Sequence, residues 1–365
     1  MDRIQFIKAS VVTAGAGILL GGCNNQAATN QDITSLIQKK YNWKMVTTWP
    51  PNFPVLGEAC QLFADWVDQM SLGQMKIKVY GAGELIPGLE VFDAVSSGAA
   101  EMGNGAAYYW AGKSPATQFF AAVPFGMNAQ QMNAWIYSGG GLALWHELYR
   151  KFGLIAFPAG NTTMQMGGWF NKEINTIDDF KGLKMRIPGL GGKVLTKAGG
   201  TAVLSSGNEI YTNLERGVID ATEWIGPYHD YVMGFHKIAK YYYSPGWHEP
   251  GSVLENMFNL KEFEALPTHL KVILETASAR MNLWVISEFE AKNNEYLNKI
   301  KAEKGVELRK FSPEILQILK KYTDEVLHEM VAADGFTKKV YNSFNTFRND
   351  IKSWAAYSEK LYHEL

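Results

Sequence analysis

The chain has 365 residues, of which 47% are hydrophobic and 13% aromatic, and its formal net charge is -1. A chain of this length can bury a large core and is expected to divide into two lobes. The near-neutral charge, without a long Lys/Arg block or a basic stripe, argues against nucleic-acid binding, because no set of cations is available to displace the counterions of a phosphate backbone. Binding or conversion of a small molecule is the better expectation.

The first residues are typical of an export signal. Arg3 and Lys8 precede an uncharged run over 9–22, which is too short to span a bilayer as a mature helix. The run ends in the letters LGGC, which resemble the lipobox of bacterial lipoproteins, so we expect Cys23 to become the lipid-bearing first residue of the mature protein. A plain Sec signal that is cut nearby is the alternative.

A polar tether follows the signal. We assign residues 1–23 to the signal, 24–42 to the tether and 43–365 to the folded domain. Cys60 is the only other cysteine, so a lipidated Cys23 would leave no disulfide. No second apolar stretch is long enough to span a bilayer, so we expect the mature protein outside the cytoplasmic membrane, held there by lipid alone.

The first part of the domain alternates strands and helices. This alternation predicts a mainly parallel sheet that is covered on both faces. The expected elements are strands over 43–49, 76–80 and 99–102, and helices over 58–70 and 89–97.

A second alternating set begins after Gly153. It predicts a second lobe, and a further strand over 252–260 is long enough to cross between the two lobes. The expected strands cover 154–160, 183–187, 201–206 and 221–224, and the expected helices cover 176–180, 194–198 and 209–216.

The pattern changes at Pro267. Apolar residues then recur at helical spacing from Leu270 to Phe289, which predicts a long helix that ends near Lys304. A short strand over 306–311 and helices over 313–333 and 337–365 complete the chain. These helices could brace the two lobes or form a dimer contact.

Common catalytic motifs are missing from the sequence. Lys193 follows glycines, but its spacing and the next residue do not match a phosphate-binding P-loop, and there is no G-x-S-x-G or H-E-x-x-H. His229 and His236 lack further zinc ligands and are assigned to the surface. Glu223 and Glu249 could form a glycosidase-type carboxylate pair, which remains an alternative.

Three polar residues occupy unusually apolar settings. Gln165, Arg186 and Glu223 follow or end predicted strands of one lobe, and open α/β sheets bind ligands at such strand ends. Glu223 lies beside an indole with no cation nearby in sequence, although a buried carboxylate needs a positive partner. We therefore expect the three side chains to converge. For each residue alone, a structural hydrogen bond or ion pair is the alternative.

Several long motifs occur in the same order as in a known family. GAGELIPGLEVFDAVSSG, GNTTMQMGGWF, LKMRIPG, IDATEW and YYYSPGWHEPG resemble the solute-binding proteins of tripartite ATP-independent periplasmic (TRAP) transporters. The resemblance covers about 43–365 and is strongest to the subset that binds α-keto acids such as pyruvate, or lactate. Only Arg3 stands where relatives often have paired arginines, which favours lipid anchoring over a twin-arginine route.

The resemblance implies a two-lobed, periplasmic-binding-protein-like α/β fold with crossing strands, a long connecting helix and C-terminal helices. Lobe I is expected to cover about 43–160 and 255–300, and lobe II about 161–254 and 305–335, with a C-terminal helix over about 336–365.

The resemblance also implies the site residues. Arg186 is expected to pair with the substrate carboxylate, and a sodium or calcium ion is expected to bridge substrate and protein. The implied metal ligands are Gln165, Glu223, the backbone oxygen of Trp224 and Glu249, and the implied substrate-side residues are Tyr108, Tyr109, Asn161 and the ring of Trp224.

The expected function is binding without catalysis: capture of a small 2-oxo or 2-hydroxy monocarboxylate and its delivery to a TRAP permease. Charge counting favours sodium if Glu223 alone joins the metal shell and calcium if Glu249 joins it too. The alternatives are a secreted hydrolase that uses the carboxylate pair, and an anchored ligand sensor for another membrane partner.

Overall fold

The computed structural model describes residues 39–363. The expected export signal, its Cys23 and most of the expected tether over 24–42 lie outside these residues. Within 39–363, no helix combines the length and the apolar character needed to cross a bilayer.

A five-stranded sheet, here called sheet A, has the strand order β2-β1-β3-β10-β4. β1 pairs in parallel with β2 and β3, whereas β10 is antiparallel to both β3 and β4. A late strand therefore completes a sheet whose other members come from the first half of the domain. The strands are β1 (Tyr41–Thr47), β2 (Met75–Tyr80), β3 (Met102–Gly105), β4 (Leu154–Asn161) and β10 (Val253–Asn259).

A six-stranded sheet, here called sheet B, has the order β11-β9-β5-β8-β6-β7. β6 pairs in parallel with β7 and β8, and β5 is antiparallel to β8 and β9. Both sheets are therefore mixed, where the sequence predicted mainly parallel strands. The strands are β5 (Gly168–Phe170), β6 (Lys184–Arg186), β7 (Thr201–Val203), β8 (Ala221–Thr222), β9 (Tyr241–Ser244) and β11 (Glu307–Lys310).

Two short segments carry the chain between the sheets. Segment 162–167 joins β4 to β5, and segment 245–252 joins β9 to β10. They are hydrogen-bonded to each other, since Thr162 N donates to Ser252 O at 3.0 Å and Gly246 N donates to Gln165 O at 2.9 Å. Residues on both segments are thereby held where the two sheets meet.

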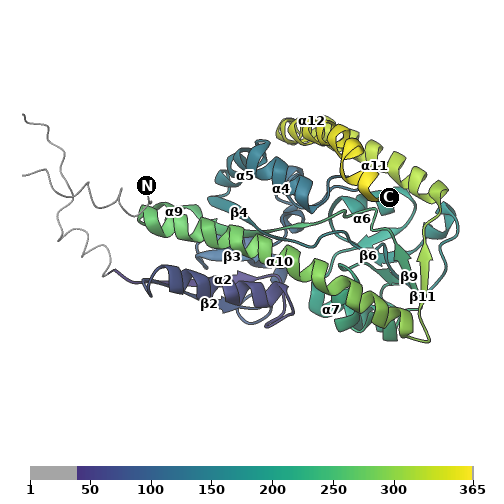
Figure 1. Ribbon diagram of the computed structural model, residues 1–365, viewed down its shortest axis with the longest axis horizontal. Helices are drawn as coiled ribbons and strands as arrows, with labels where there is room; N and C mark the ends of the chain where they lie inside the picture. The colour runs from purple at the N-terminus through teal and green to yellow at the C-terminus, as the bar shows by residue number, and fades with distance from the viewer. Residues whose placement is uncertain (1–38, 364–365) are drawn as a thin grey trace, which may run out of the picture. The chain divides into compact units, whose positions relative to one another are not determined.

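The long helix α10 (Thr268–Ala302) packs against sheet A and against a helix that follows a strand of sheet B (Figure 1). It contacts β4 and α2 (Leu56–Met70) on the side of sheet A, and α8 (Pro227–Val232) after the end of β8 in sheet B. Six of the apolar positions that predicted the helix are buried: Leu270, Leu274, Ala277, Met281, Val285 and Phe289. The predicted extent of this helix and its buried face are confirmed.

The remaining helices cover the sheets. α3 and α5 pack on sheet A, α6 and α7 on sheet B, and α11 packs on α6. Their bounds, in chain order, are α3 (Val91–Ser96), α4 (Ala129–Ser138), α5 (Gly141–Arg150), α6 (Gly189–Lys197), α7 (Gly207–Glu215), α9 (Leu260–Glu264), α11 (Pro313–Ala333), α12 (Gly335–Tyr357) and α13 (Glu359–His363).

Several element boundaries differ from the predictions. The strand expected over 99–102 begins at Met102, and the strand expected over 221–224 ends at Thr222, so that Glu223 follows it. The last helix is interrupted at Ser358, whose backbone leaves the helical region at φ -123° and ψ -101°. α4, α5, α8 and α9 were not predicted.

Candidate functional site

Arg186 and Glu223 lie at the ends of two adjacent parallel strands. β6 ends at Arg186, which is level with Thr222 of β8, and Glu223 N donates to Arg186 O at 3.1 Å. The Arg186 side chain donates from Nη1 to Glu223 Oε1, and both side chains are only 1% exposed. Adjacent strand ends thus bring together two of the three residues that the sequence predicted to converge.

The guanidinium of Arg186 is held from several sides. Nε donates to Ser205 O at 3.4 Å, and Nη2 makes a long contact of 3.5 Å with the hydroxyl of Tyr109. Its Cζ lies 5.1 Å from the centre of the Trp224 ring, within the range of a cation–π interaction. Burial lowers the pKa of Arg186, but Glu223 and nearby tyrosines raise it, and the net shift is upward. The group therefore stays positively charged.

The second oxygen of Glu223 faces a histidine that the sequence reasoning did not include. His248 Nε2 lies 3.2 Å from Glu223 Oε2, and the His248 side chain is buried. Its Nδ1 has no hydrogen-bond partner within residues 39–363. Its position directly before Glu249 in the sequence could have marked His248 as a candidate site residue. Its contact with Glu223 depends on the path of segment 245–252 between the sheets, which the sequence alone does not give.

Gln165 and Glu249 meet where the two crossing segments run together. Gln165 Nε2 donates to Thr162 Oγ1 and to Glu249 Oε2, each at 2.9 Å. Both side chains are buried, and Gln165 Oε1 has no partner in the described part of the chain. A buried amide oxygen without a donor is available to coordinate a cation.

Glu223, His248 and Glu249 together form a group that could hold a metal ion. One ligand atom from each lies within 4.8 Å of the others, and all three residues are buried. Burial, and then the charge of Glu223, raise the pKa of Glu249 well above its usual value. A positive charge placed here would relieve this repulsion. The carboxylate oxygens of Glu223 and Glu249, together with the free oxygen of Gln165, fit a hard cation such as sodium or calcium, which takes oxygen ligands.

Aromatic rings from loops and a short helix that follow strands of the two sheets lie around the charged group. The Trp224 ring meets Trp49 edge-on at 6.4 Å and Phe53 at 6.1 Å. Tyr108 and Tyr109 pack against each other at 4.8 Å in a short 3-10 helix, and Tyr109 also packs against Trp49. These rings exclude water from the neighbourhood of Arg186, which strengthens its charge interactions.

Asn161 lies at the end of β4, where the first crossing segment begins. It is buried, and its Oδ1 accepts a hydrogen bond from Thr163 N at 2.9 Å. Its Nδ2 has no partner among residues 39–363. The side chain therefore has a free donor at the junction of the sheets.

The surface assignment of His229 was wrong. His229 is fully buried on α8, and its Nδ1 accepts a hydrogen bond from Trp224 Nε1 at 3.3 Å. Burial lowers its pKa to about 3, so the ring is neutral. His236 is half-buried.

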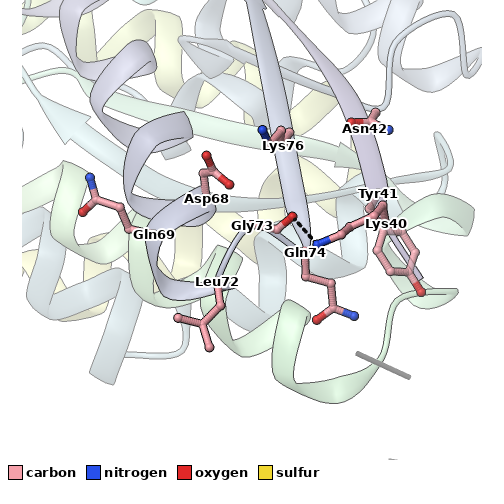
Figure 2. Close-up of a pocket in the computed structure, with 9 residues that line it drawn as sticks. All are labelled: Lys40, Tyr41, Asn42, Asp68, Gln69, Leu72, Gly73, Gln74 and Lys76. Atoms are coloured by element: carbon pink, nitrogen blue, oxygen red, sulfur yellow. Dashed lines mark hydrogen bonds between the residues drawn. The ribbon is translucent and has the colours of Figure 1, made fainter. Parts of the chain in front are cut away.

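A separate hollow of about 720 Å³ lies at the start of β1 and β2, away from this group of residues (Figure 2). Its lining includes Lys40, Asp68, Leu72 and Lys76, and Lys40 Nζ donates to Gly73 O at 3.0 Å. It shares no residue with the group around Arg186 and Glu223.

Comparison with known proteins gives consistent matches. Residues 45–334 match the profile of DctP, described as bacterial extracellular solute-binding protein, family 7. A relative from Nostoc sp. (strain PCC 7120), named monocarboxylate 2-oxoacid-binding periplasmic protein, is 44% identical over 365 residues, which is 100% of this chain and 99% of the relative.

Two solved structures are similar over most of the chain. One is a TRAP periplasmic solute binding protein from Pseudoalteromonas atlantica T6c with bound sodium and pyruvate, and the other is from Colwellia psychrerythraea with bound calcium and pyruvate. Each is 43% identical with a TM-score of 0.87, and the match covers 89% of this chain and 99% of that chain. The expected periplasmic-binding-protein-like α/β fold is confirmed.

Proposed function

The chain belongs to bacterial extracellular solute-binding protein family 7, and on this premise we propose that it captures a small 2-oxo or 2-hydroxy monocarboxylate, with pyruvate the first candidate. Members of this family are extracytoplasmic solute-binding proteins. The observation that carries the proposal is the buried group in which Arg186 pairs with Glu223, while Gln165 donates to Glu249 and keeps a free amide oxygen.

Arg186 is the proposed carboxylate receptor. Its planar guanidinium can donate two parallel hydrogen bonds to a carboxylate, which a lysine cannot do. Nη1 donates to Glu223, whereas the one contact of Nη2 within residues 39–363 is the long one to the Tyr109 hydroxyl. Entry of a substrate carboxylate would therefore take over Arg186 and release Glu223 Oε1.

Glu223 then needs another positive partner. Gln165, Glu223, the backbone oxygen of Trp224 and Glu249 are the residues proposed to hold a sodium or calcium ion. When bound, such an ion supplies positive charge to the carboxylates and to the 2-oxo or 2-hydroxy oxygen of the substrate. The substrate, Arg186 and Glu223 sum to -1, which suits sodium, whereas an ionised Glu249 makes the sum -2, which suits calcium.

The walls of the site favour a small ligand. Trp49, Tyr108, Tyr109, Asn161 and the Trp224 ring are the proposed substrate-side residues. A ligand of the size of pyruvate gains at most about 9 kcal/mol, which corresponds to a dissociation constant of roughly 0.1–1 μM. Such an affinity requires a closed, water-free cleft, as the burial of the charged group here supports.

Sheets A and B are proposed to be the centres of two closing lobes, I (about 43–160 and 255–300) and II (about 161–254 and 305–335). Closure on the ligand would signal loading to the proposed partner, a TRAP membrane permease. Lipidation at Cys23 would keep the protein at the outer face of the membrane, and a homodimer through the C-terminal helices is the proposed assembly.

Binding without chemical conversion is the proposed activity. The alternatives remain a hydrolase that uses Glu223 and Glu249, and a ligand sensor. Mass spectrometry of the recovered ligand separates the first alternative, because a hydrolase returns product and a binding protein returns the acid unchanged. A pull-down of membrane partners separates the second.

The central test is a tryptophan-fluorescence titration, for which 11 tryptophans are available. Pyruvate, lactate and larger 2-oxo acids are titrated in sodium, calcium and chelated sodium-free buffers. We expect saturable binding of small 2-oxo or 2-hydroxy acids that weakens strongly when both cations are removed. Unchanged affinity in the chelated sodium-free buffer would contradict the cation site, and no binding of any of these acids would contradict the substrate class.

A further inference from the structure

Asp230, on α8, is a buried carboxylate outside the group described above. Its Oδ2 accepts hydrogen bonds from the hydroxyl of Tyr242 at 2.8 Å and from Trp169 Nε1 at 3.1 Å. Its Oδ1 accepts from the backbone N–H of Ile225 at 3.2 Å. Two aromatic side chains of sheet B thus fix the carboxylate, and the carboxylate in turn fixes one backbone amide.

That amide belongs to the peptide bond between Trp224 and Ile225. In a trans peptide the N–H and the C=O point in opposite directions, so an acceptor on the Ile225 N–H also sets the direction of the Trp224 carbonyl. The next carbonyl is held as well, because Ile225 O accepts from Met166 N at 3.0 Å. The backbone beside Glu223 is therefore held on both sides of Ile225.

The indole of Trp224 is held by the same helix. Trp224 Nε1 donates to His229 Nδ1, and the His229 ring packs edge-on against Phe53 at 4.9 Å and Phe289 at 4.8 Å. Two consecutive residues of α8, His229 and Asp230, therefore fix the ring and the backbone of Trp224.

We propose that Asp230 is a positioning residue of the cation site, which aims the Trp224 carbonyl oxygen at the position between Glu223 and Glu249. The inference rests on the proposed function, in which that oxygen is a cation ligand. Asp230 also polarises the peptide, because an N–H that donates to a carboxyl group leaves more negative charge on the carbonyl oxygen. Partners of this kind orient metal ligands and raise their basicity.

Sheet A contains a matched control. Glu255 is also fully buried, and its Oε1 accepts from Trp110 Nε1 at 2.6 Å and from the hydroxyl of Tyr149 at 2.9 Å. It therefore has the same two kinds of aromatic donor as Asp230. No backbone amide donates to it among the described residues, and it is not one of the proposed ligands. Glu255→Ala therefore removes a buried carboxylate and the hydrogen bonds from its two aromatic donors, as Asp230→Ala does, but leaves the Trp224–Ile225 peptide untouched.

The test is a calorimetric titration of sodium chloride, and separately of calcium chloride, into the purified protein at saturating pyruvate. Asp230→Ala removes the acceptor of the Ile225 N–H and should raise the half-saturating cation concentration by about 10–100-fold. Asp230→Asn keeps an acceptor oxygen and should recover most of the affinity. Glu255→Ala should leave the cation affinity close to that of the wild type.

Folding is checked by circular dichroism. If Asp230→Ala does not fold, the test uses Trp169→Phe combined with Tyr242→Phe. This double variant keeps an aromatic ring at both positions but removes both donors to the carboxylate, and it should also weaken cation binding. A folded Asp230→Ala, or otherwise a folded double variant, that matches the wild type within about threefold in cation affinity overturns the inference. Equal weakening by Glu255→Ala overturns it too, because the effect would then be structural.

The cation dependence of the wild type and of Asp230→Ala distinguishes the role of Asp230 from the existence of the cation site. If the pyruvate affinity of the wild type is the same with and without sodium and calcium, the proposed cation site is wrong, and so is the role of Asp230. If the wild type requires a cation, and Asp230→Ala has the same half-saturating cation concentration, only the proposed role of Asp230 is wrong.

Discussion

Arg186 and Glu223 contact each other directly from the ends of two adjacent parallel strands, and each side chain is 1% exposed. A buried ion pair returns little net stability, because the desolvation of both charges offsets their attraction. Under the proposed function, the two residues form an exchangeable pair. A substrate carboxylate would then replace Glu223 at Arg186, and Glu223 would pair with a cation, so that the number of unpaired charges would not rise on binding.

Arg186→Lys tests the role of the guanidinium. The lysine keeps a positive charge opposite Glu223, so we expect the fold to survive. It cannot donate two parallel hydrogen bonds, and losing one charged bond should weaken pyruvate binding by about 10–100-fold. Calorimetric titration with pyruvate measures the change. Arg150→Lys, in an exposed ion pair with Glu264, is the control, and equal affinities of Arg186→Lys and the wild type would remove Arg186 from the binding site.

Glu249→Gln tests which cation the site prefers. The substitution removes one negative charge from the group within 4.8 Å of Glu223 and His248. A divalent ion loses more attraction than a monovalent ion when a charge is removed, so calcium affinity should fall more than sodium affinity. Titrations with each cation at saturating pyruvate give the ratio. An unchanged ratio would mean that Glu249 does not join the shell, and Glu255→Gln controls for the loss of a buried carboxylate.

Gly207→Ala tests the placement of the Trp224 ring. A Cβ at Gly207 would lie 2.7 Å from Trp224 Cη2, so the ring has to move. Overpacking of this kind stores about 1–3 kcal/mol, and we expect pyruvate affinity to fall by about tenfold or more. Near-ultraviolet circular dichroism should report the displaced indole. Gly112→Ala is the control, because a Cβ there meets nothing within 4 Å, and a Gly207→Ala protein with wild-type affinity would show that the ring position does not matter.

Glu255→Gln tests the dependence of stability on pH. Burial raises the pKa of Glu255 from 4.5 to about 7, so the folded state holds a proton that the unfolded state has lost over this range. The free energy of unfolding therefore falls as the pH rises from about 4.5 to about 7, by up to about 3 kcal/mol from this group.

Glutamine cannot ionise, so this part of the decline should disappear in Glu255→Gln. Urea unfolding at pH 4 and pH 8 measures it for both proteins. Glu290→Gln, which removes an exposed carboxylate of α10, is the control. Parallel pH curves for the wild type and Glu255→Gln would contradict the raised pKa.

The local pattern of the sequence predicted a large part of this protein. Helical spacing from Leu270 to Phe289 predicted α10 and its buried face, because side-chain periodicity is a local property. The positions of Arg186 and Glu223 at strand ends predicted that they would converge, since parallel strands end on the same edge of a sheet.

Other contacts depend on segments that are far apart in the chain. His248 reaches Glu223, and Gln165 reaches Glu249, only because segments 162–167 and 245–252 run side by side between the sheets. No local sequence pattern encodes the alignment of these two segments. It depends on the long-range pairing of β10 with β3 and β4.

Residue type and local periodicity are properties of the linear chain, so the sequence alone was enough to nominate residues with the chemistry for a carboxylate and cation site. The pairing of Glu223 with Arg186, and the hydrogen bond from the Ile225 N–H to Asp230, became visible only in the folded chain. A buried charge is paired by the groups that the packing of distant segments brings within hydrogen-bond distance, and no local pattern specifies those groups.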